Sequence, residues 1–406
     1  MIILLPVSCK ECPTEPDYDI SLSVEDVACV WVTLNVTLPD SGKINTFALE
    51  RNDSTIATFT CFDDDTLITD EGLTPDNDYS YTIRFLKDGQ TKAESDPVSV
   101  HTLPTTSHDF TWEIDVLGNY GSCLNDVWIG DENNIWVVGN IETNTGEYNA
   151  AHWNGEEWEL LGIYSNTLDL YSIWYFSHDD IWVTSGVPIH WNGNEWLHYH
   201  LWSMGILNND DGGVEHIWAS SPDDIYFVGR KGSIVHYDGS TFRKIESGTE
   251  MYIKDVHGFD DNTIYCAAVR IQDWTSNLIQ IRNNQVVNQY HDDIYRGGIW
   301  SPSPYYLFAV GQGLFKYNTI NQTMTEQTWP SAAPLWLVSV IDGTVVNNVF
   351  TGGHNSIVFH YNGESWHYYP ELLGYDVIHG VDVKDNMVVF VGHNNNQVCI
   401  IIGKKE

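Results

Sequence analysis

The sequence predicts an all-β protein, because one short phrase recurs along most of the chain. The clearest copies are VWIGDENNIWVVG from Val127, IWYFSHDDIWVTSG from Ile173, IWASSPDDIYFVG from Ile217 and IWSPSPYYLFAVG from Ile299. Weaker copies begin at Val256, Val338 and Val381. In the clear copies an apolar pair leads through a mostly polar turn into an alternating apolar strand that ends at Gly, which is typical of a β-hairpin.

A second phrase follows several copies of the first. It reads HWNGEEW at His152, HWNGNEW at His190, HYDGSTF at His236 and HYNGESW at His360. Its Asn-Gly or Asp-Gly pair predicts a tight turn, because these residues tolerate positive φ. Two hairpins make four strands, and seven such units recur at roughly 40–47 residues, the spacing of a propeller blade. We therefore predict a seven-bladed β-propeller with four-stranded blades over residues 109–406.

The two ends of this repeat array complement each other. The seventh unit, Tyr375–Gly403, contains only three predicted strands before the repeat ends. Phe110–Leu117, which reads FTWEIDVL, precedes the first unit and has no hairpin partner of its own. We expect this segment to pair beside Gln397–Gly403, so that residues 110–117 complete the last blade and no edge strand stays open.

Residues 19–103 lack both repeated phrases. From Leu73 they read LTPDNDYSY, followed by TIRFLKDGQTKAESDPVSVHTLP, which resembles the C-terminal half of a fibronectin type III domain. In that family the Leu-x-Pro and the Tyr, here Tyr79, form the corner before strand F. Phe47–Asp53 resembles strand C, and Val36 stands where the family usually has a core Trp. The resemblance implies a small β-sandwich over residues 19–103, joined to the propeller by a linker at 104–108.

The first residues read MIILLPVSCKECPTEP, and the apolar run that ends at Ser8 and Cys9 resembles the cleavage end of a bacterial lipoprotein signal. That resemblance implies lipidation of Cys9 and anchoring at the cell surface or outer membrane. Pro6 departs from the pattern, and the apolar run is short for a full signal. Residues 1–18 are therefore interpreted as a signal remnant and linker, with a secreted protein or an unmodified tail as the alternatives.

The other cysteines leave disulfide pairing open. The chain has seven cysteines, so six remain if Cys9 is lipidated. Cys29 and Cys61 both lie in the fibronectin-like part, whereas Cys123 and Cys399 lie in the first and last predicted blades. Either pair is a candidate bridge, and free thiols are the alternative.

Charge limits the partners that this chain can recruit. The net charge is −38, with 18 basic and 56 acidic residues. Such a balance excludes the basic footprint of a nucleic-acid-binding protein. No run approaches the roughly 18 apolar residues of a membrane span, so we expect membrane contact only through an anchor at Cys9.

Catalytic and metal-binding motifs are absent from the sequence. It contains no G-x-S-x-G elbow, no H-E-x-x-H, no phosphate loop and no EF-hand pattern, and we expect neither a cofactor nor a metal. His152, His190, His236 and His360 share one repeat position, so we interpret them as structural. These absences favour a non-enzymatic binding protein. The alternative is a polysaccharide-active propeller enzyme, a glycoside hydrolase or lyase, whose paired carboxylates sequence alone does not locate. A structural module without a small ligand is a third possibility.

The candidate binding residues are aromatic and Arg residues outside the repeated phrases, since repeat-position Trp residues are expected to pack between blades. They fall in predicted loops that enter a blade or join its second and third strands, which gather on one face of a propeller. Long loops on a rigid scaffold commonly carry binding sites, and we expect a glycan or protein partner there. The candidates are Trp202, Trp274, Trp336, Tyr164, Tyr295, Tyr375, Arg230, Arg270 and Arg296.

Overall fold

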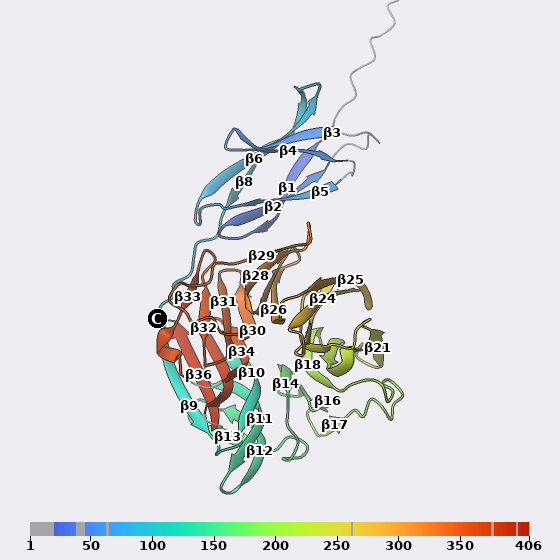
Figure 1. Cartoon of the computed structure of the whole chain (residues 1–406), viewed down its shortest axis with the longest axis vertical. Helices are drawn as coiled ribbons and strands as arrows, with labels where there is room; N and C mark the ends of the chain where they lie inside the picture. Colours follow the sequence, from blue (N-terminus) through green and yellow to red (C-terminus); the bar gives the residue numbers. More distant parts are fainter. Residues whose placement is uncertain are drawn as a thin grey trace, which may run out of the picture. The chain divides into compact units, whose positions relative to one another are not determined.

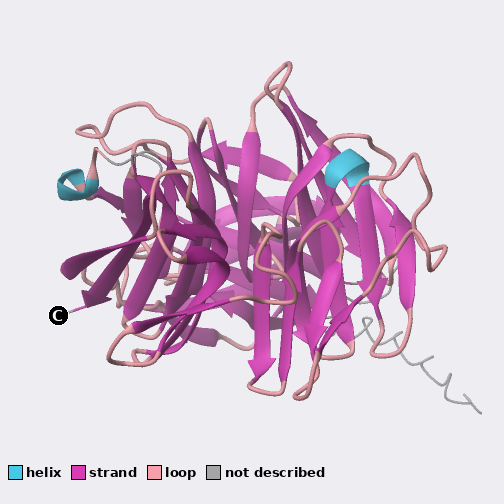
Figure 2. Cartoon of the chain, turned by 90° about the horizontal axis from the view of Figure 1, so that it is seen from below, coloured by secondary structure: helices cyan, strands magenta, loops and turns pink. Residues whose placement is uncertain are grey.

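The computed structural model describes residues 20–37, 45–61, 65–260, 263–374, 377–394 and 397–405. The chain forms two compact units, Met1–Pro104 and Thr105–Glu406 (Figure 1). The described residues are mostly strand, with two short 3-10 helices at Arg230–Gly232 and Pro370–Leu372 (Figure 2). In these described ranges, no helix has the length and apolar character needed to cross a membrane.

The first unit contains two antiparallel sheets around one apolar core. One sheet has the order β1-β2-β5 and the other β4-β3-β6-β7, with β8 also paired to β6. The bounds are β1 (Ser21–Val27), β2 (Trp31–Thr37), β3 (Asn45–Arg51), β4 (Ser54–Cys61), β5 (Asp65–Glu71), β6 (Asp78–Lys87), β7 (Gln90–Glu94) and β8 (Val98–His101). Alternate residues of these strands, such as Leu34, Val36, Phe47, Tyr81 and Ile83, fill the space between the sheets.

The corner before β6 has the geometry that the Leu-x-Pro and Tyr pattern predicts. Leu73 is buried, and the Thr74 backbone N–H donates to the Tyr79 hydroxyl oxygen at 2.9 Å. The Tyr79 hydroxyl thus fixes the turn before β6 to the backbone. Val36, which stands where the fibronectin pattern has a Trp, is fully buried. Trp31 is also buried, at another position of the same strand β2.

The second unit contains seven four-stranded antiparallel sheets in the part of the chain that is described. Their strands follow the chain, and we number the sheets 1 to 7 in that order. Sheet 1 is β10 (Cys123–Asp131), β11 (Asn134–Thr143), β12 (Gly146–Trp153) and β13 (Trp158–Leu161); sheet 2 is β14 (Ser172–Ser177), β15 (Asp180–Thr184), β16 (Pro188–Trp191) and β17 (Trp196–His198); sheet 3 is β18 (Val214–Ser221), β19 (Asp224–Gly229), β20 (Ser233–Tyr237) and β21 (Phe242–Glu246).

The later sheets repeat this order. Sheet 4 is β22 (Tyr252–Asp260), β23 (Thr263–Arg270), β24 (Thr275–Arg282) and β25 (Gln285–Asp292); sheet 5 is β26 (Arg296–Ser303), β27 (Tyr306–Gly311), β28 (Gly313–Asn318) and β29 (Thr323–Glu326); sheet 6 is β30 (Val338–Val345), β31 (Asn348–Gly353), β32 (Val358–Tyr361) and β33 (Trp366–Tyr368). Sheet 7 is β34 (Val377–Lys384), β35 (Met387–Asn394), β36 (Gln397–Lys405) and β9 (Phe110–Leu117).

The first strand of each sheet lies innermost, and these strands form a closed ring. Each of β10, β14, β18, β22, β26, β30 and β34 contacts the next, and β34 contacts β10 again. This radial arrangement of four-stranded sheets is that of a β-propeller. Sheet 7 combines both ends of the unit, because β9 pairs antiparallel with β36 from Leu117↔Val398 to Phe110↔Lys405 (Figure 1). This is the pairing that the incomplete last repeat predicts.

Candidate functional site

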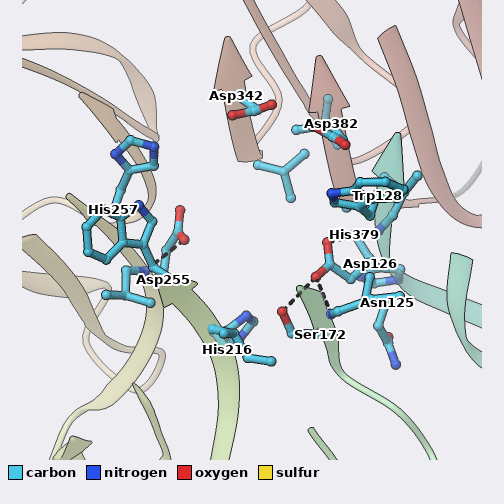
Figure 3. A pocket seen from close by; sticks show the side chains of 18 of the residues that line it. Asn125, Asp126, Trp128, Ser172, His216, Asp255, His257, Asp342, His379 and Asp382 are labelled. Atoms are coloured by element: carbon cyan, nitrogen blue, oxygen red, sulfur yellow. Dashed lines mark hydrogen bonds between the residues drawn. The ribbon is translucent and has the colours of Figure 1, made fainter. Parts of the chain in front are cut away.

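The innermost strands enclose a central channel of about 340 Å³. Figure 3 shows that acidic and imidazole side chains point into it from several sheets. The polar lining includes Asn125, Asp126, Ser172, His216, Lys254, Asp255, His257, Asp342, His379 and Asp382. The sequence analysis did not single out these residues. Most of them directly precede the residue pair that begins a repeated phrase, whereas His257 and Asp382 occupy the second position of that pair and Asp342 occupies the equivalent strand position.

Two of the channel carboxylates join neighbouring inner strands. Asp126 accepts hydrogen bonds from the Ile173 N–H at 2.9 Å and from the Ser172 hydroxyl at 2.7 Å (Figure 3). Asp255 occupies the equivalent place in sheet 4 and accepts from the Ile299 N–H at 2.8 Å. Burial raises the pKa of Asp126 to about 6 and that of Asp255 to about 7, despite these hydrogen bonds. Their contacts therefore give these carboxylates a structural role.

Asp342 and Asp382 form a carboxyl pair between sheets 6 and 7. Asp342 accepts from the Val383 N–H at 2.8 Å, and Asp382 accepts from the Ile129 N–H of sheet 1. The two carboxyl groups also share a side-chain hydrogen bond. Burial and the neighbouring acid raise the pKa of Asp342 well above its usual range, and burial raises that of Asp382 to about 6. A shared proton between the two acids relieves the repulsion.

Lys254 crosses part of the channel because sheet 5 leaves room for it. Its Nζ donates to the Ser339 carbonyl oxygen of sheet 6 at 3.1 Å. Between them, sheet 5 has Gly297 and Gly298. A Cβ at Gly297 would lie 3.0 Å from the Lys254 side chain, and one at Gly298 would lie 3.0 Å from the Ser339 carbonyl oxygen. The two glycines thus make this ammonium bridge possible.

The three candidate Trp residues lie on separate loops and differ in exposure. Trp274, between β23 and β24, is 44% exposed and packs edge-on against Tyr295 at 5.6 Å between ring centroids. Trp336, between β29 and β30, is 43% exposed. Trp202 is half-buried on its own loop, where its indole N–H donates to the Asn208 carbonyl. Only the first two rings present a large free face.

The remaining candidate residues also divide into exposed and buried side chains. Tyr164 is exposed and stacks on His198, and Arg270 is half-exposed beside Asp273. The Arg230 side chain is exposed although it pairs with the buried Glu215. The sequence analysis places Tyr295 and Arg296 on the binding face, but both are buried, and Arg296 pairs with Asp292 above the Phe315 ring. Both therefore stabilise the loop that enters sheet 5. Tyr375 lies outside the described residues.

One shallow hollow gathers several of the accessible groups. Its lining includes Lys231, Glu250, Tyr252, Arg270 and Ile271, which come from the loops within sheets 3 and 4 and from the segment that enters β22. Ile271 is 62% exposed, and Trp274 follows in the same β23–β24 loop. We call Lys231, Arg270, Ile271 and Trp274 the basic aromatic patch.

The repeated histidines have the structural contacts expected of a shared repeat position. His190 bonds Asp180 at 2.8 Å and His236 bonds Asp224 at 2.7 Å, in each case at the first residue of the second strand. His152 and His360 bond Asn134 and Asn348 at the equivalent positions. Each imidazole therefore ties the third strand of its sheet to the start of the second strand.

The candidate disulfide bridge between the first and last sheets of the second unit does not form. Cys123 and Cys399 are both free thiols. Along β36, Val398 and Ile400 pack toward sheet 1, whereas Cys399 and Ile401 pack toward sheet 6. Cys399 thus faces away from sheet 1, because neighbouring residues of a strand point to opposite faces. In the first unit, Cys29 is buried with its Sγ 3.2 Å from the Pro104 carbonyl oxygen.

One group of side chains has the composition of a metal site. Ligand atoms of Cys123, His379 and His393 all lie within 4.8 Å of one another. Burial raises the pKa of the Cys123 thiol to about 11 and lowers that of His379 to about 4. The absence of metal-binding motifs from the sequence predicts no metal, and these three residues follow no spacing motif.

Comparisons with known proteins support the fold class. The sequence matches no protein-family model and no curated protein. Among solved structures, the chain resembles "YCF48 bound to D1 peptide", with a TM-score of 0.56 and 13% identity over 75% of this chain and 97% of the other. It also resembles the extracellular domain of the putative hybrid two-component system BT3049 from B. thetaiotaomicron, with a TM-score of 0.52 and 11% identity. That match covers 72% of this chain and 42% of the other. At these identities the likeness concerns the fold alone.

Proposed function

We propose that this chain is a non-enzymatic extracellular binding protein that holds a protein segment on the basic aromatic patch. In this proposal the first unit is a fibronectin type III-like spacer, and the second is a seven-bladed propeller that presents the binding loops. The Leu-x-Pro and Tyr corner supports the first assignment. The seven four-stranded sheets and the ring of inner strands support the second.

The observation that carries the proposal is the chemistry of the basic aromatic patch. On a chain of net charge −38, Lys231 and Arg270 border one hollow together with an exposed Ile271, and Trp274 lies in the adjoining loop. Glu250 lines the same hollow and Asp273 pairs with Arg270, so each cation has an acidic group nearby or in the same hollow. Aromatic and Arg side chains dominate many interfaces, and charge complementarity selects the partner. The exposed Ile271 and Trp274 fit a peptide segment with apolar side chains, and the two cations favour acidic residues within it. One solved propeller of similar fold is bound to a peptide, which favours a protein segment over a glycan.

We also propose that lipidation of Cys9 anchors the protein at a bacterial cell surface. This residue lies outside the described part of the chain, and the proposal rests on the resemblance of its sequence to a lipoprotein signal. Incorporation of a labelled fatty acid that Cys9→Ala abolishes would support it, and labelling that persists in this variant would contradict it.

A panel of peptides and glycans tests the binding proposal on the full chain. We expect acidic peptides with aromatic or aliphatic residues to bind, and Trp274→Ala to weaken binding by about 1–3 kcal/mol. Arg270→Glu should weaken it further and reduce its salt dependence. Tyr120→Ala and Arg243→Glu are matched controls, because both residues are exposed away from the patch.

Three outcomes contradict the proposal. Binding of peptides that Trp274→Ala leaves unchanged would exclude the patch. Binding of glycans alone would replace the partner class. New reducing ends released from a polysaccharide would favour the enzyme alternative, which needs two suitably spaced carboxylates.

A further inference from the structure

Three side chains from the first and last sheets of the second unit converge where the ring closes. Cys123 is the first residue of β10 in sheet 1, whereas His379 and His393 lie on β34 and β35 of sheet 7. On β35, Val389 and Val391 pack toward sheet 1, so His393 has the same facing by strand alternation. His379 also lines the central channel (Figure 3).

Two of the three distances within this cluster are close to those of a tetrahedral metal site. The Cys123 Sγ lies 3.7 Å from His393 Nδ1, and His379 Nε2 lies 3.0 Å from the same nitrogen. Zinc–ligand bond lengths and a tetrahedral angle require about 3.6 Å between sulfur and nitrogen and about 3.4 Å between two nitrogens. The third distance, between Cys123 Sγ and the His379 ring nitrogen, is within 4.8 Å, so a metal ion would draw these two residues closer together.

The type of ligand limits the type of metal. One thiolate and two imidazoles are soft or borderline donors, which suit zinc and neighbouring transition metals rather than calcium or magnesium. Three protein ligands leave a fourth position, and His379 places the cluster at the channel, where water or another small ligand has access.

We propose that Cys123, His379 and His393 bind one Zn²⁺ ion, which links sheet 1 to sheet 7 across the closure of the ring. The ion adds a second link to the closure, beside the pairing of β9 with β36. The residues come from both ends of the second unit, so the bound ion stabilises the closed ring against unfolding.

Metal titration of the reduced, chelator-treated full chain tests this site. We expect one equivalent of Co²⁺ to bind with a thiolate-to-metal charge-transfer band, and Zn²⁺ to displace it. Cys123→Ser should remove this band and weaken Zn²⁺ binding at least about 100-fold, and His379→Ala and His393→Ala should weaken it by a similar factor. Cys399→Ala is the matched control, because this buried thiol faces away from sheet 1 and should leave the band unchanged.

A second measurement needs no substitution. In the unaltered reduced chain, Zn²⁺ should protect Cys123 from alkylation and raise the melting temperature. The proposal is overturned if no thiolate band forms, if Cys123→Ser leaves Zn²⁺ affinity unchanged, or if Zn²⁺ fails to slow alkylation of Cys123.

Discussion

Each inner strand of the propeller contacts the next inner strand through a side chain at an equivalent position, and these side chains are of two kinds. We call the space between two neighbouring inner strands at this position a gap. At one equivalent position of the first strand, four sheets carry an aromatic ring and three carry a hydrogen-bond acceptor. In every sheet except sheet 2, this position lies two residues beyond a shift in strand register. The ring positions are Trp128, Trp174, Trp218 and Trp300, and the acceptor positions are His257, Asp342 and Asp382. Both kinds of side chain reach toward the same place on the next inner strand.

The aromatic gaps are closed by surface contact. The Trp128 ring stacks on Tyr175 of sheet 2 with 4.0 Å between centroids. The Trp218 ring covers Gly258 of sheet 4 so closely that a Cβ there would lie 2.5 Å from it. Such contacts depend on area and shape, and they do not depend on protonation.

The polar gaps are closed by acceptors for backbone N–H groups. Asp342 accepts from Val383, Asp382 from Ile129, and the His257 ring nitrogen from Ser301 at 3.3 Å. Burial raises the pKa values of these acids and lowers that of His257 to about 4. The comparison teaches that one fold position tolerates two chemistries, of which only the polar one makes stability depend on pH.

The largest expected effect comes from breaking the closure itself. Deleting residues 1–117 removes β9 and exposes the edge of β36, so we expect the free energy of unfolding of the second unit to fall by at least about 5 kcal/mol. Deleting residues 1–104 should change it little, because that deletion ends at the boundary between the units. Calorimetry of both truncations checks this, and equal melting temperatures would refute it.

The next effect concerns an aromatic gap. Trp218→Ala should lower the free energy of unfolding by about 3–5 kcal/mol, because it empties a buried site between sheets 3 and 4. The loss should be the same at pH 5 and pH 8, since no charge changes. Denaturant unfolding measures it, with the exposed Trp274→Ala as a control expected within about 0.5 kcal/mol of the unaltered chain. A pH-dependent loss of stability for Trp218→Ala would contradict the claim that the aromatic contacts are independent of protonation.

The smallest of these effects concerns a channel carboxylate at a neighbouring position. The pKa of Asp255 is raised to about 7 on folding, so the folded chain binds more protons than the unfolded chain between about pH 4 and pH 7. Its contribution to stability therefore falls as pH rises through that window, by up to about 3 kcal/mol. Asp255→Asn removes this dependence, so the variant should gain stability relative to the unaltered chain between pH 4.5 and pH 8.

Comparing the two chains at each pH is essential for that measurement. Buried histidines such as His216, with a pKa lowered to about 3, act in the opposite direction and lose stability as pH falls below about 6.5. Their effect is common to both chains and cancels in the difference. Asp238→Asn is the control, because its lowered pKa places its titration below this window. If the difference in unfolding free energy between Asp255→Asn and the unaltered chain does not change with pH, this carboxyl is ionised in the channel without a cost in stability.

Much of the fold was predictable from local patterns. The two repeated phrases located the inner and outer hairpins, because apolar alternation and polar or Asp/Asn-Gly turns act within a few residues. The missing fourth strand of the last repeat also predicted the pairing of Phe110–Leu117 with β36. The candidate site was less predictable. Tyr295 and Arg296 fall in a loop by pattern, yet a neighbouring ring and an acid bury them.

The sequence by itself determined the strands, their order and the chemistry available at each repeat position, since these follow from periodicity and turn residues. Only the tertiary structure decided which side chains share a space. Cys123 meets His379 and His393 because ring closure brings the first and last sheets together, although more than 250 residues separate them. Cys399 does not reach this cluster, because strand alternation turns its side chain toward sheet 6. Contacts of this kind depend on closure and facing across the whole unit, which no short stretch of sequence records.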